Sequence, residues 1–311
     1  MERIMSQASN IIAGVGFCTG NGTGDLSVLE RALARHADLG ADIAELSLYS
    51  EDLVSGGRVL PERIGRLVEI TKRYKLGYTV HGLVCSNFMD MVNLPYQKAA
   101  MRAMLELCDR VGASVLVHHS GMAPMKTRGE MGLVDAMERE ALAEMAEVAR
   151  GYGVRIALEN IFAMGDDEYR QTPSEVAATV AAIGHPNLCA LIDFSHAYIE
   201  SKRRGLDWRA EIRAMAPVAG HLHVHDSFGR PYTMTRFFHP GEAMALGIGD
   251  LHMPLGWGDI PWEEIFAELT FPAGTTMIME ITERFEPELP ACLARARGLA
   301  ALADEKAAVA A

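Results

Sequence analysis

The chain has 311 residues, is 49% hydrophobic and carries a formal net charge of -12, a composition typical of an acidic globular protein with a substantial core. This charge disfavours broad attraction to nucleic acid or to an anionic membrane, and no apolar run approaches the length of a membrane span. Residues 1–10 carry no signal pattern, and the five cysteines are scattered without a CxxC pair, so we expect reduced thiols in a cytoplasmic protein.

Short apolar runs alternate along the chain with segments of helical periodicity. The runs are mostly unbroken, as expected of parallel strands that are covered on both faces. In chain order the predicted strands are residues 11–17, 42–48, 78–81, 114–119, 154–159, 189–193, 220–225 and 276–281. A strand–helix unit that recurs eight times fits either a closed (β/α)8 barrel or an open doubly wound sheet.

The intervening segments show helix signals. Residues 133–152 carry an apolar stripe of helical period, and Thr172 begins a capping box with proline at the next position. Helices are expected to end at Gly40, Gly77, Gly112 and Gly184. No shift in composition marks a domain boundary, so we predict a single domain over residues 1–311, in which the long segment 227–258 after the seventh strand forms an active-site lid.

The carboxyl ends of the third to eighth predicted strands all carry residue types that bind metal ions. These residues are His81, His119, Glu159, Asp193, His196, His223 and Glu280, with Asp250 and His252 following later. Neighbouring strands of an open sheet are ~4.8 Å apart, so its third and eighth strands could not share a site, whereas a closed barrel directs every strand end to one mouth. The pattern therefore predicts a single (β/α)8 TIM barrel and a metal site together. Glu, Asp and His suit Mn²⁺, Zn²⁺ or Co²⁺, with Mg²⁺ also possible.

Three further histidines near these strand ends have simpler interpretations. Strand alternation points His118 away from its neighbour His119, and His221 and His225 lie one pleat below and above His223. We therefore expect these three side chains to be packed or hydrogen-bonded rather than ligands.

The strand-end motifs are LEN at 158–160, DFSH at 193–196, HVHD at 223–226, DLHMPLGWG at 250–258 and MEI at 279–281. In their order and strand placement they resemble the xylose isomerase-like barrels, the sugar-phosphate isomerases and epimerases, with endonuclease IV as a relative. The resemblance implies that Glu159, Asp193, His223 and Glu280 hold one metal ion, and that His196 contacts a substrate oxygen.

The resemblance to endonuclease IV implies further ligands. The residues that hold its second and third zinc ions fall, in this chain, on His81, His119, His196, Asp250 and His252. These residues are possible additional metal ligands, and His81 and His119 are alternatively substrate-binding residues. We expect one metal ion to dominate.

The predicted lid supplies the substrate contacts, and two of its positions relate to the family pattern. Arg230 is the nearest match to an arginine that binds substrate in the family. Trp257 replaces an acidic residue of the family, and its indole suits either stacking on a sugar or packing within the protein. The expected contact residues of the lid are Arg230, Tyr232, Arg236, Phe237 and His239.

The predicted function is metal-dependent isomerisation or epimerisation of a small carbohydrate-like compound: a sugar, sugar phosphate, cyclitol or keto acid. The metal would polarise a carbonyl, while Glu159 and Glu280 flank the carbon α to it and move its proton. The same site acts as a lyase or dehydratase if a leaving group lies β to the carbonyl.

Two other functions compete with this one. An endonuclease IV-like phosphodiesterase would need basic loops for phosphate contacts, yet the loops after the second and third strands are not basic. The cationic cluster at residues 201–204 is more typical of a solvated surface, which disfavours a nucleic-acid partner. A non-catalytic barrel is disfavoured by the intact ligand set, and a homo-oligomer is compatible with the sequence.

Overall fold

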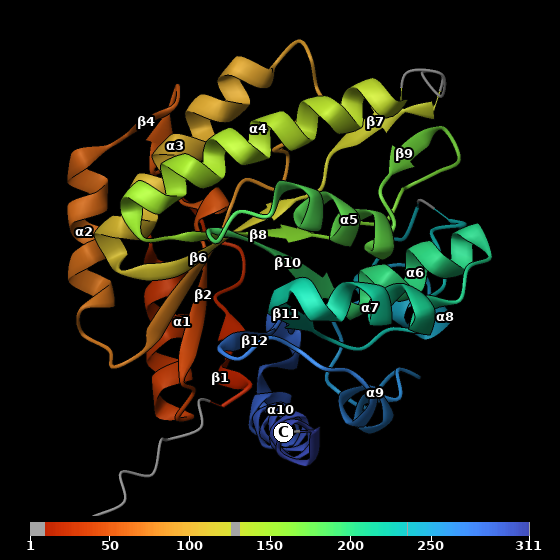
Figure 1. The fold of residues 1–311 in the computed structure, drawn as a ribbon. Coiled ribbons are helices and arrows are strands. Elements are labelled where there is room, and N and C mark those ends of the chain that lie inside the picture. The colour runs from red at the N-terminus through yellow and green to blue at the C-terminus, as the bar shows by residue number, and fades with distance from the viewer. Residues whose placement is uncertain (1–9, 126–130, 235, 311) are drawn as a thin grey trace, which may run out of the picture.

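At the centre of the computed structural model, which describes residues 10–125, 131–234 and 236–310, eight parallel strands close into a barrel (Figure 1). The strands are β1 (Ile12–Cys18), β2 (Ile43–Ser47), β5 (Gly77–His81), β6 (Ala113–His119), β8 (Arg155–Glu159), β10 (Leu188–Asp193), β11 (Ala219–Val224) and β12 (Thr275–Met279). The single domain predicted over 1–311 includes residues 1–9, 126–130, 235 and 311, which lie outside the described residues.

The order of the strands decides between the two predicted architectures. Neighbours in the barrel follow the order of the chain, and β12 pairs with β1 to close it. Each of the eight predicted strands corresponds to one barrel strand, with ends that differ by a few residues. The (β/α)8 barrel is therefore confirmed over the open doubly wound sheet.

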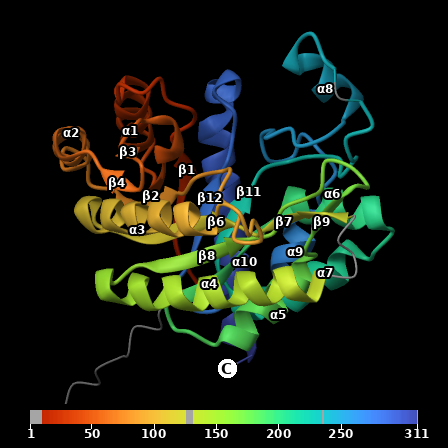
Figure 2. The ribbon, with the colours of Figure 1, turned by 90° about the horizontal axis from the view of Figure 1, so that it is seen from above.

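Helices surround the barrel, as Figures 1 and 2 show. They are α1 (Ser27–Asp38), α2 (Pro61–Thr71), α3 (Leu94–Val111), α4 (Met131–Tyr152), α5 (Pro173–Ile183), α6 (Phe194–Arg204), α7 (Trp208–Met215), α8 (Pro240–Leu246), α9 (Trp262–Glu268) and α10 (Leu289–Ala310), with 3-10 turns η1 (Leu48–Ser50), η3 (Ala216–Val218) and η4 (Glu283–Glu288). Among the described helices, none is both long enough and apolar enough to cross a membrane. All five cysteines are free.

The local helix signals are mostly confirmed. Thr172 and Glu175 form the predicted capping box, and Gly112 and Gly184 end their helices in the left-handed conformation, with φ of 71° and 60°. The expectation for Gly77 is wrong, because α2 already ends at Thr71 and Gly77 begins β5.

Several short elements were not predicted. Two small antiparallel sheets lie outside the barrel: β3 (Val54–Ser55) pairs with β4 (Arg58–Val59), and β7 (Met122–Pro124) pairs with β9 (Glu168–Arg170). The segment 227–258 contains the short helix α8, which projects from one end of the barrel at the upper right of Figure 2.

On the side formed by β6, β8 and β10, the interior of the barrel has an apolar lower part and a polar upper part. Side chains alternate along a strand, so every second residue points inward. Inside the barrel a small apolar cluster comes from β6, β8 and β10, and consists of Val115, Val117, Ala157, Cys189 and Leu191. Two residues further along these strands stand His119, Glu159 and Asp193. The polar residues therefore sit above a packed floor at the carboxyl ends of the strands.

Candidate metal centre at the barrel mouth

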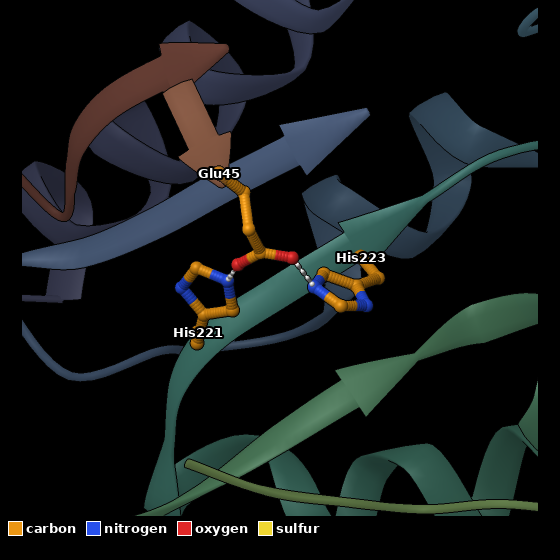
Figure 3. A group of neighbouring side chains, drawn as sticks. All are labelled: Glu45, His221 and His223. Atoms are coloured by element: carbon orange, nitrogen blue, oxygen red, sulfur yellow. Dashed lines mark hydrogen bonds and ion pairs between the residues drawn. The ribbon is translucent and has the colours of Figure 1, made fainter. Parts of the chain in front are cut away.

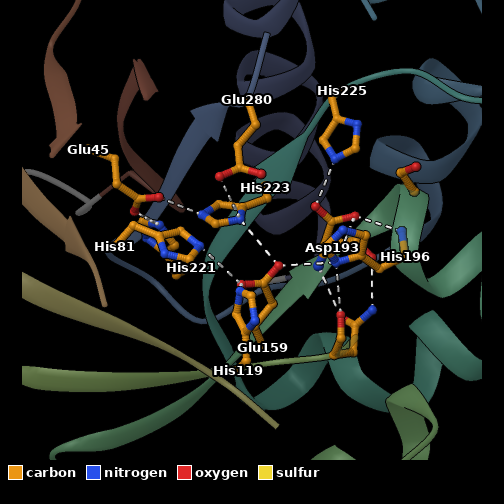
Figure 4. A network of polar contacts seen from close by, with 12 residues as sticks. Glu45, His81, His119, Glu159, Asp193, His196, His221, His223, His225 and Glu280 are labelled. Atoms are coloured by element: carbon orange, nitrogen blue, oxygen red, sulfur yellow. Dashed lines mark hydrogen bonds and ion pairs between the residues drawn. The ribbon is translucent and has the colours of Figure 1, made fainter. Parts of the chain in front are cut away.

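Four carboxylate and imidazole groups converge where β8, β10, β11 and β12 end (Figure 4). Single ligand atoms of Glu159, Asp193 and His223 lie within 4.8 Å of one another. His223 Nδ1 is 3.6 Å from Glu159 Oε1 and also 3.6 Å from Glu280 Oε1. The structure thus brings together the four residues that the resemblance assigns to one ion.

Several atoms of this group lack a hydrogen-bond partner among the described residues. Both carboxylate oxygens of Glu159 and Nδ1 of His223 are buried and have none. A buried polar group without a partner costs roughly 1–3 kcal/mol, and more when it is charged. A divalent cation between these atoms would satisfy them together, so the residues present fit a metal ion.

A second group adjoins the first through Glu159. His119 Nε2 and His81 Nε2 lie 3.4 Å and 3.7 Å from Glu159 Oε2. The Nδ1 of His81 is 3.1 Å from the carbonyl oxygen of Gly82, so an N–H on Nδ1 can donate there and leave Nε2 with a free lone pair. Burial lowers the pKa of His119 to about 3, although Glu159 opposes this, and the neutral imidazole is the form that binds metals.

A third group lies on the opposite side of the quartet. His252 Nε2 and His196 Nε2 are 2.7 Å and 3.3 Å from Asp250 Oδ2. Both rings direct Nδ1 at a backbone carbonyl oxygen. Nδ1 of His252 is 2.9 Å from the carbonyl oxygen of Glu280, and Nδ1 of His196 is 3.2 Å from that of Asn160. Asp250 therefore joins His196 and His252 in one polar cluster beside the quartet.

Of the three histidines that were not expected as ligands, His225 reaches the centre, where its ligand atoms group with those of Asp193 and His196 and with those of His252 and Glu280. His225 Nε2 lies 2.9 Å from Asp193 Oδ2, and its ring stacks on His252 with centroids 4.1 Å apart. His118 points away from the mouth and packs on Phe88, with ring centroids 4.5 Å apart. His221 is hydrogen-bonded inside the barrel.

The centre is rich in negative charge, and its histidines respond to it. Burial alone would lower the pKa of His223, but Glu280, Glu45 and Glu159 outweigh burial and hold that pKa well above its usual range. Likewise burial opposes the charge on His252, yet Asp250 raises the pKa of this ring to about 10. Without a metal ion the carboxylates therefore retain protons on neighbouring imidazoles.

A cavity of about 560 Å³ opens above these groups at the barrel mouth. Its lining includes Asp250, His252 and Glu280, together with Tyr49 and Arg284. Tyr49 was not predicted; its hydroxyl donates to Asn21 Oδ1 at 2.7 Å, and its ring lies edge-on to His81. No strand-end motif pointed to this tyrosine.

The predicted lid contacts have mixed outcomes. The guanidinium of Arg230 donates to the carbonyl of Leu246, and Trp257 is 45% exposed with its ring edge-on to Phe285. Neither lines the mouth cavity. Tyr232 does reach the ligand groups, because its hydroxyl accepts the N–H of Asp250 at 3.1 Å.

His239 and Arg236 contact other residues of the lid. His239 caps α8 by accepting the N–H of Gly241, Arg236 lies over the ring of Phe238, and Phe237 is half-buried.

Glu45 is the main ligand-like residue that the sequence reasoning missed. It lies on β2, is fully buried, and approaches both His221 and His223 to 2.9 Å. A charged residue in the middle of an apolar strand run was the available signal, since buried glutamates are rare unless paired.

Comparisons with known proteins agree with this fold. A family model described as xylose isomerase-like TIM barrel matches residues 33–300. The chain is 23% identical over 236 residues to the uncharacterised protein MJ1311 of Methanocaldococcus jannaschii, a match covering 73% of this chain and 72% of that protein.

Two solved structures are also similar. A D-tagatose 3-epimerase-like protein has a TM-score of 0.69 at 18% identity, over 94% of this chain and 99% of that one. The TTHB071 protein from Thermus thermophilus, soaked with ZnCl2, has a TM-score of 0.62 at 24% identity, over 93% and 98% of the two chains. At such identities these likenesses establish the fold.

Proposed function

This chain belongs to the xylose isomerase-like TIM-barrel family, and we propose that it is a metal-dependent isomerase or epimerase of small polyhydroxylated carbonyl compounds. One observation carries the proposal. Carboxylate oxygens of Glu159 and Glu280, from strands on different sides of β11, lie at the same distance of 3.6 Å from Nδ1 of His223. Two bases thus flank one candidate ion position.

The proposed chemistry follows from this arrangement. A divalent ion held by Glu159, Asp193, His223 and Glu280 would supply a Lewis acid for the substrate carbonyl, and Mn²⁺, Zn²⁺, Co²⁺ or Mg²⁺ fits these ligands. One of the two glutamates then removes the proton α to the carbonyl. Return of a proton on the other face gives epimerisation, and return to the adjacent carbon gives isomerisation. A leaving group β to the carbonyl turns the same site into a lyase.

The remaining polar residues are assigned to the substrate or to further ions. His196 lies beside Glu159 and Asp250, at 3.2 Å and 3.3 Å, and is proposed to contact a substrate oxygen. His81 and His119 either bind substrate or complete a second ion site with Glu159. Arg230 and Trp257 remain candidate substrate contacts that would require movement of the lid. The cytoplasmic location and the homo-oligomer also remain predictions.

The size and charge of the mouth support a small substrate. Its cavity of about 560 Å³ lies within the usual range of pockets for small molecules, about 300–1,000 Å³. Asp250, Glu280 and Glu283 line it, and these acidic groups disfavour the backbone of a nucleic acid. The name of the D-tagatose 3-epimerase-like neighbour also supports a sugar as the substrate class.

A second candidate function is favoured by the two additional ligand groups. His81 and His119 share Glu159 with the quartet, and His196 and His252 converge on Asp250. Several ions side by side would suit phosphodiester hydrolysis of the endonuclease IV type. The number of ions bound at saturation therefore bears on which function is correct.

The test compares both chemistries on protein loaded with Mn²⁺, Zn²⁺ or Co²⁺. Candidate ketoses, inososes, hydroxypyruvate and their phosphates are incubated in D₂O, and we expect deuterium at the α carbon or product formation with one substrate class. A duplex with an abasic site is assayed in parallel. Metal-dependent nicking of this duplex, without label or product from any carbonyl compound, would replace the isomerase proposal by the nuclease one.

A further inference from the structure

Glu45 forms a buried polar network below the candidate metal centre. It points into the barrel from β2 and is fully buried, as are His221 and His223 on β11 (Figure 3). Its Oε2 accepts the hydroxyl of Thr79 at 2.9 Å and lies 2.9 Å from His221 Nε2, while its Oε1 lies 2.9 Å from His223 Nε2. One carboxylate thus faces three donors.

The position of this carboxylate is fixed by the strands around it. Thr79 is the register partner of Glu45 on β5, and Thr276 is the register partner of His221 on β12. The hydroxyl of Thr276 contacts His221 Nδ1, so both nitrogens of His221 have partners. Glu45 therefore reaches from β2 across the barrel to β11, past the two strands that separate them.

His223 is oriented differently from His81 and His252. These two histidines direct Nδ1 at backbone carbonyls and Nε2 at neighbouring carboxylates, whereas Nδ1 of His196 faces both the Asn160 carbonyl and Glu159 Oε1. In His223 the nitrogens are exchanged, because Nδ1 faces Glu159 and Glu280 and Nε2 faces Glu45. The Glu45–His223 pair is close, although neither atom meets full hydrogen-bond geometry.

We propose that Glu45 is a positioning residue that keeps the proton of His223 on Nε2 and thereby presents the lone pair of Nδ1 to the metal ion. A neutral imidazole carries one N–H, and the partner of one nitrogen selects the tautomer and the orientation of the ring. A carboxylate accepts this N–H and also makes the ring a stronger ligand. The proposal rests on the proposed function, because it requires the metal centre.

Glu45→Gln tests the proposal with little change in shape. Glutamine has one acceptor oxygen and one NH₂ group, so it cannot accept from both imidazoles as the carboxylate does. Removing such an outer partner weakens metal affinity by about 10- to 100-fold. Thr79→Val is the matched control, because it removes a different contact of the same carboxylate and leaves His223 untouched.

The measurement is Zn²⁺ affinity by competition with a chelator, with the number of ions bound. We expect the dissociation constant to rise by about 10- to 100-fold in Glu45→Gln at unchanged stoichiometry, and to stay near the wild-type value in Thr79→Val. Equal affinities in all three proteins would overturn the proposal. Loss of a whole ion at saturating Zn²⁺ would also overturn it, because Glu45 would then be a ligand.

A second measurement on the wild-type protein does not depend on the folding of a variant. Long-range proton–nitrogen NMR of the Zn²⁺-loaded protein reports which nitrogen of His223 carries the proton, with the ring assigned through its correlations to the wild-type backbone. We expect the proton on Nε2; a proton on Nδ1 refutes the role of Glu45. Failure of the wild-type protein to bind Zn²⁺ would refute the metal centre of the proposed function together with this role. If the wild-type protein binds Zn²⁺ and Glu45→Gln binds it with the same dissociation constant, this role alone is refuted.

Discussion

Glu138, a buried side chain on α4, should make the stability of the protein depend on pH. Its carboxylate is fully buried and accepts the N–H of Gly121, in the loop that follows His119. Burial raises the pKa of Glu138 from an ordinary 4.5 to about 7, although the Gly121 N–H opposes this. A difference of about 2.5 pH units corresponds to roughly 3 kcal/mol.

The direction in which stability changes with pH follows from proton binding to Glu138. Because the folded state holds this proton more tightly than the unfolded state, the free energy of unfolding falls as pH rises from about 4.5 to about 7. Glu138→Gln cannot ionise, so its free energy of unfolding relative to wild type should rise by roughly 3 kcal/mol across this window. Urea unfolding with a chelator present, at pH 4.5, 6 and 8, measures this difference.

The matched control is Glu140→Gln, which changes an exposed glutamate on the same helix. Its stability difference from wild type should stay nearly constant with pH. If the pH profiles of wild type and Glu138→Gln run parallel, then Glu138 is not protonated in the folded protein, and the reasoning from burial is wrong.

Three further predictions concern the metal centre and its floor. Glu280→Gln should weaken metal binding and lower kcat by about 10²- to 10⁴-fold, because it removes a candidate ligand and a candidate base. Metal analysis and steady-state kinetics measure these effects, and full activity of the variant would contradict the prediction. Zn²⁺ binding at pH 7 should release protons, because burial is outweighed by carboxylates that hold the pKa values of His196 and His223 well above the usual range in the metal-free protein. Titration calorimetry in buffers of different ionisation heat measures this release. A binding heat that is the same in every buffer would contradict the prediction. Leu191→Ala should lower the free energy of unfolding by about 2–5 kcal/mol, because it opens a cavity in the barrel floor while leaving the candidate ligands in place. Urea unfolding measures this loss, and an unchanged midpoint would show that the floor is not tightly packed.

The barrel and the convergence of the candidate ligand residues could be predicted from the sequence because both depend on local features. Each strand is a short apolar run, and each polar residue at its end is directed to the common mouth by the barrel itself. Glu159, Asp193 and His223 therefore meet although they come from three separate strands.

The missed features depend on contacts that local patterns do not encode. Glu45 and His221 are 176 residues apart in sequence, and only the closed barrel brings them together. Arg230 was expected at the substrate, but its direction is set by a backbone carbonyl of the lid, at Leu246. The helix α8 was hidden in a segment rich in proline and glycine, where its short length gives little periodicity.

The apolar floor of the barrel has a consequence for the fate of a proton taken from a substrate. Ala157 is fully buried two residues before Glu159 on the same strand, and it packs with Val117 and Leu191 of the neighbouring strands. On this side of the barrel, exchange of a proton held on Glu159 would therefore proceed by way of the mouth. A bound substrate would occupy that route, so the rate at which label enters from D₂O would depend on how long the substrate stays bound.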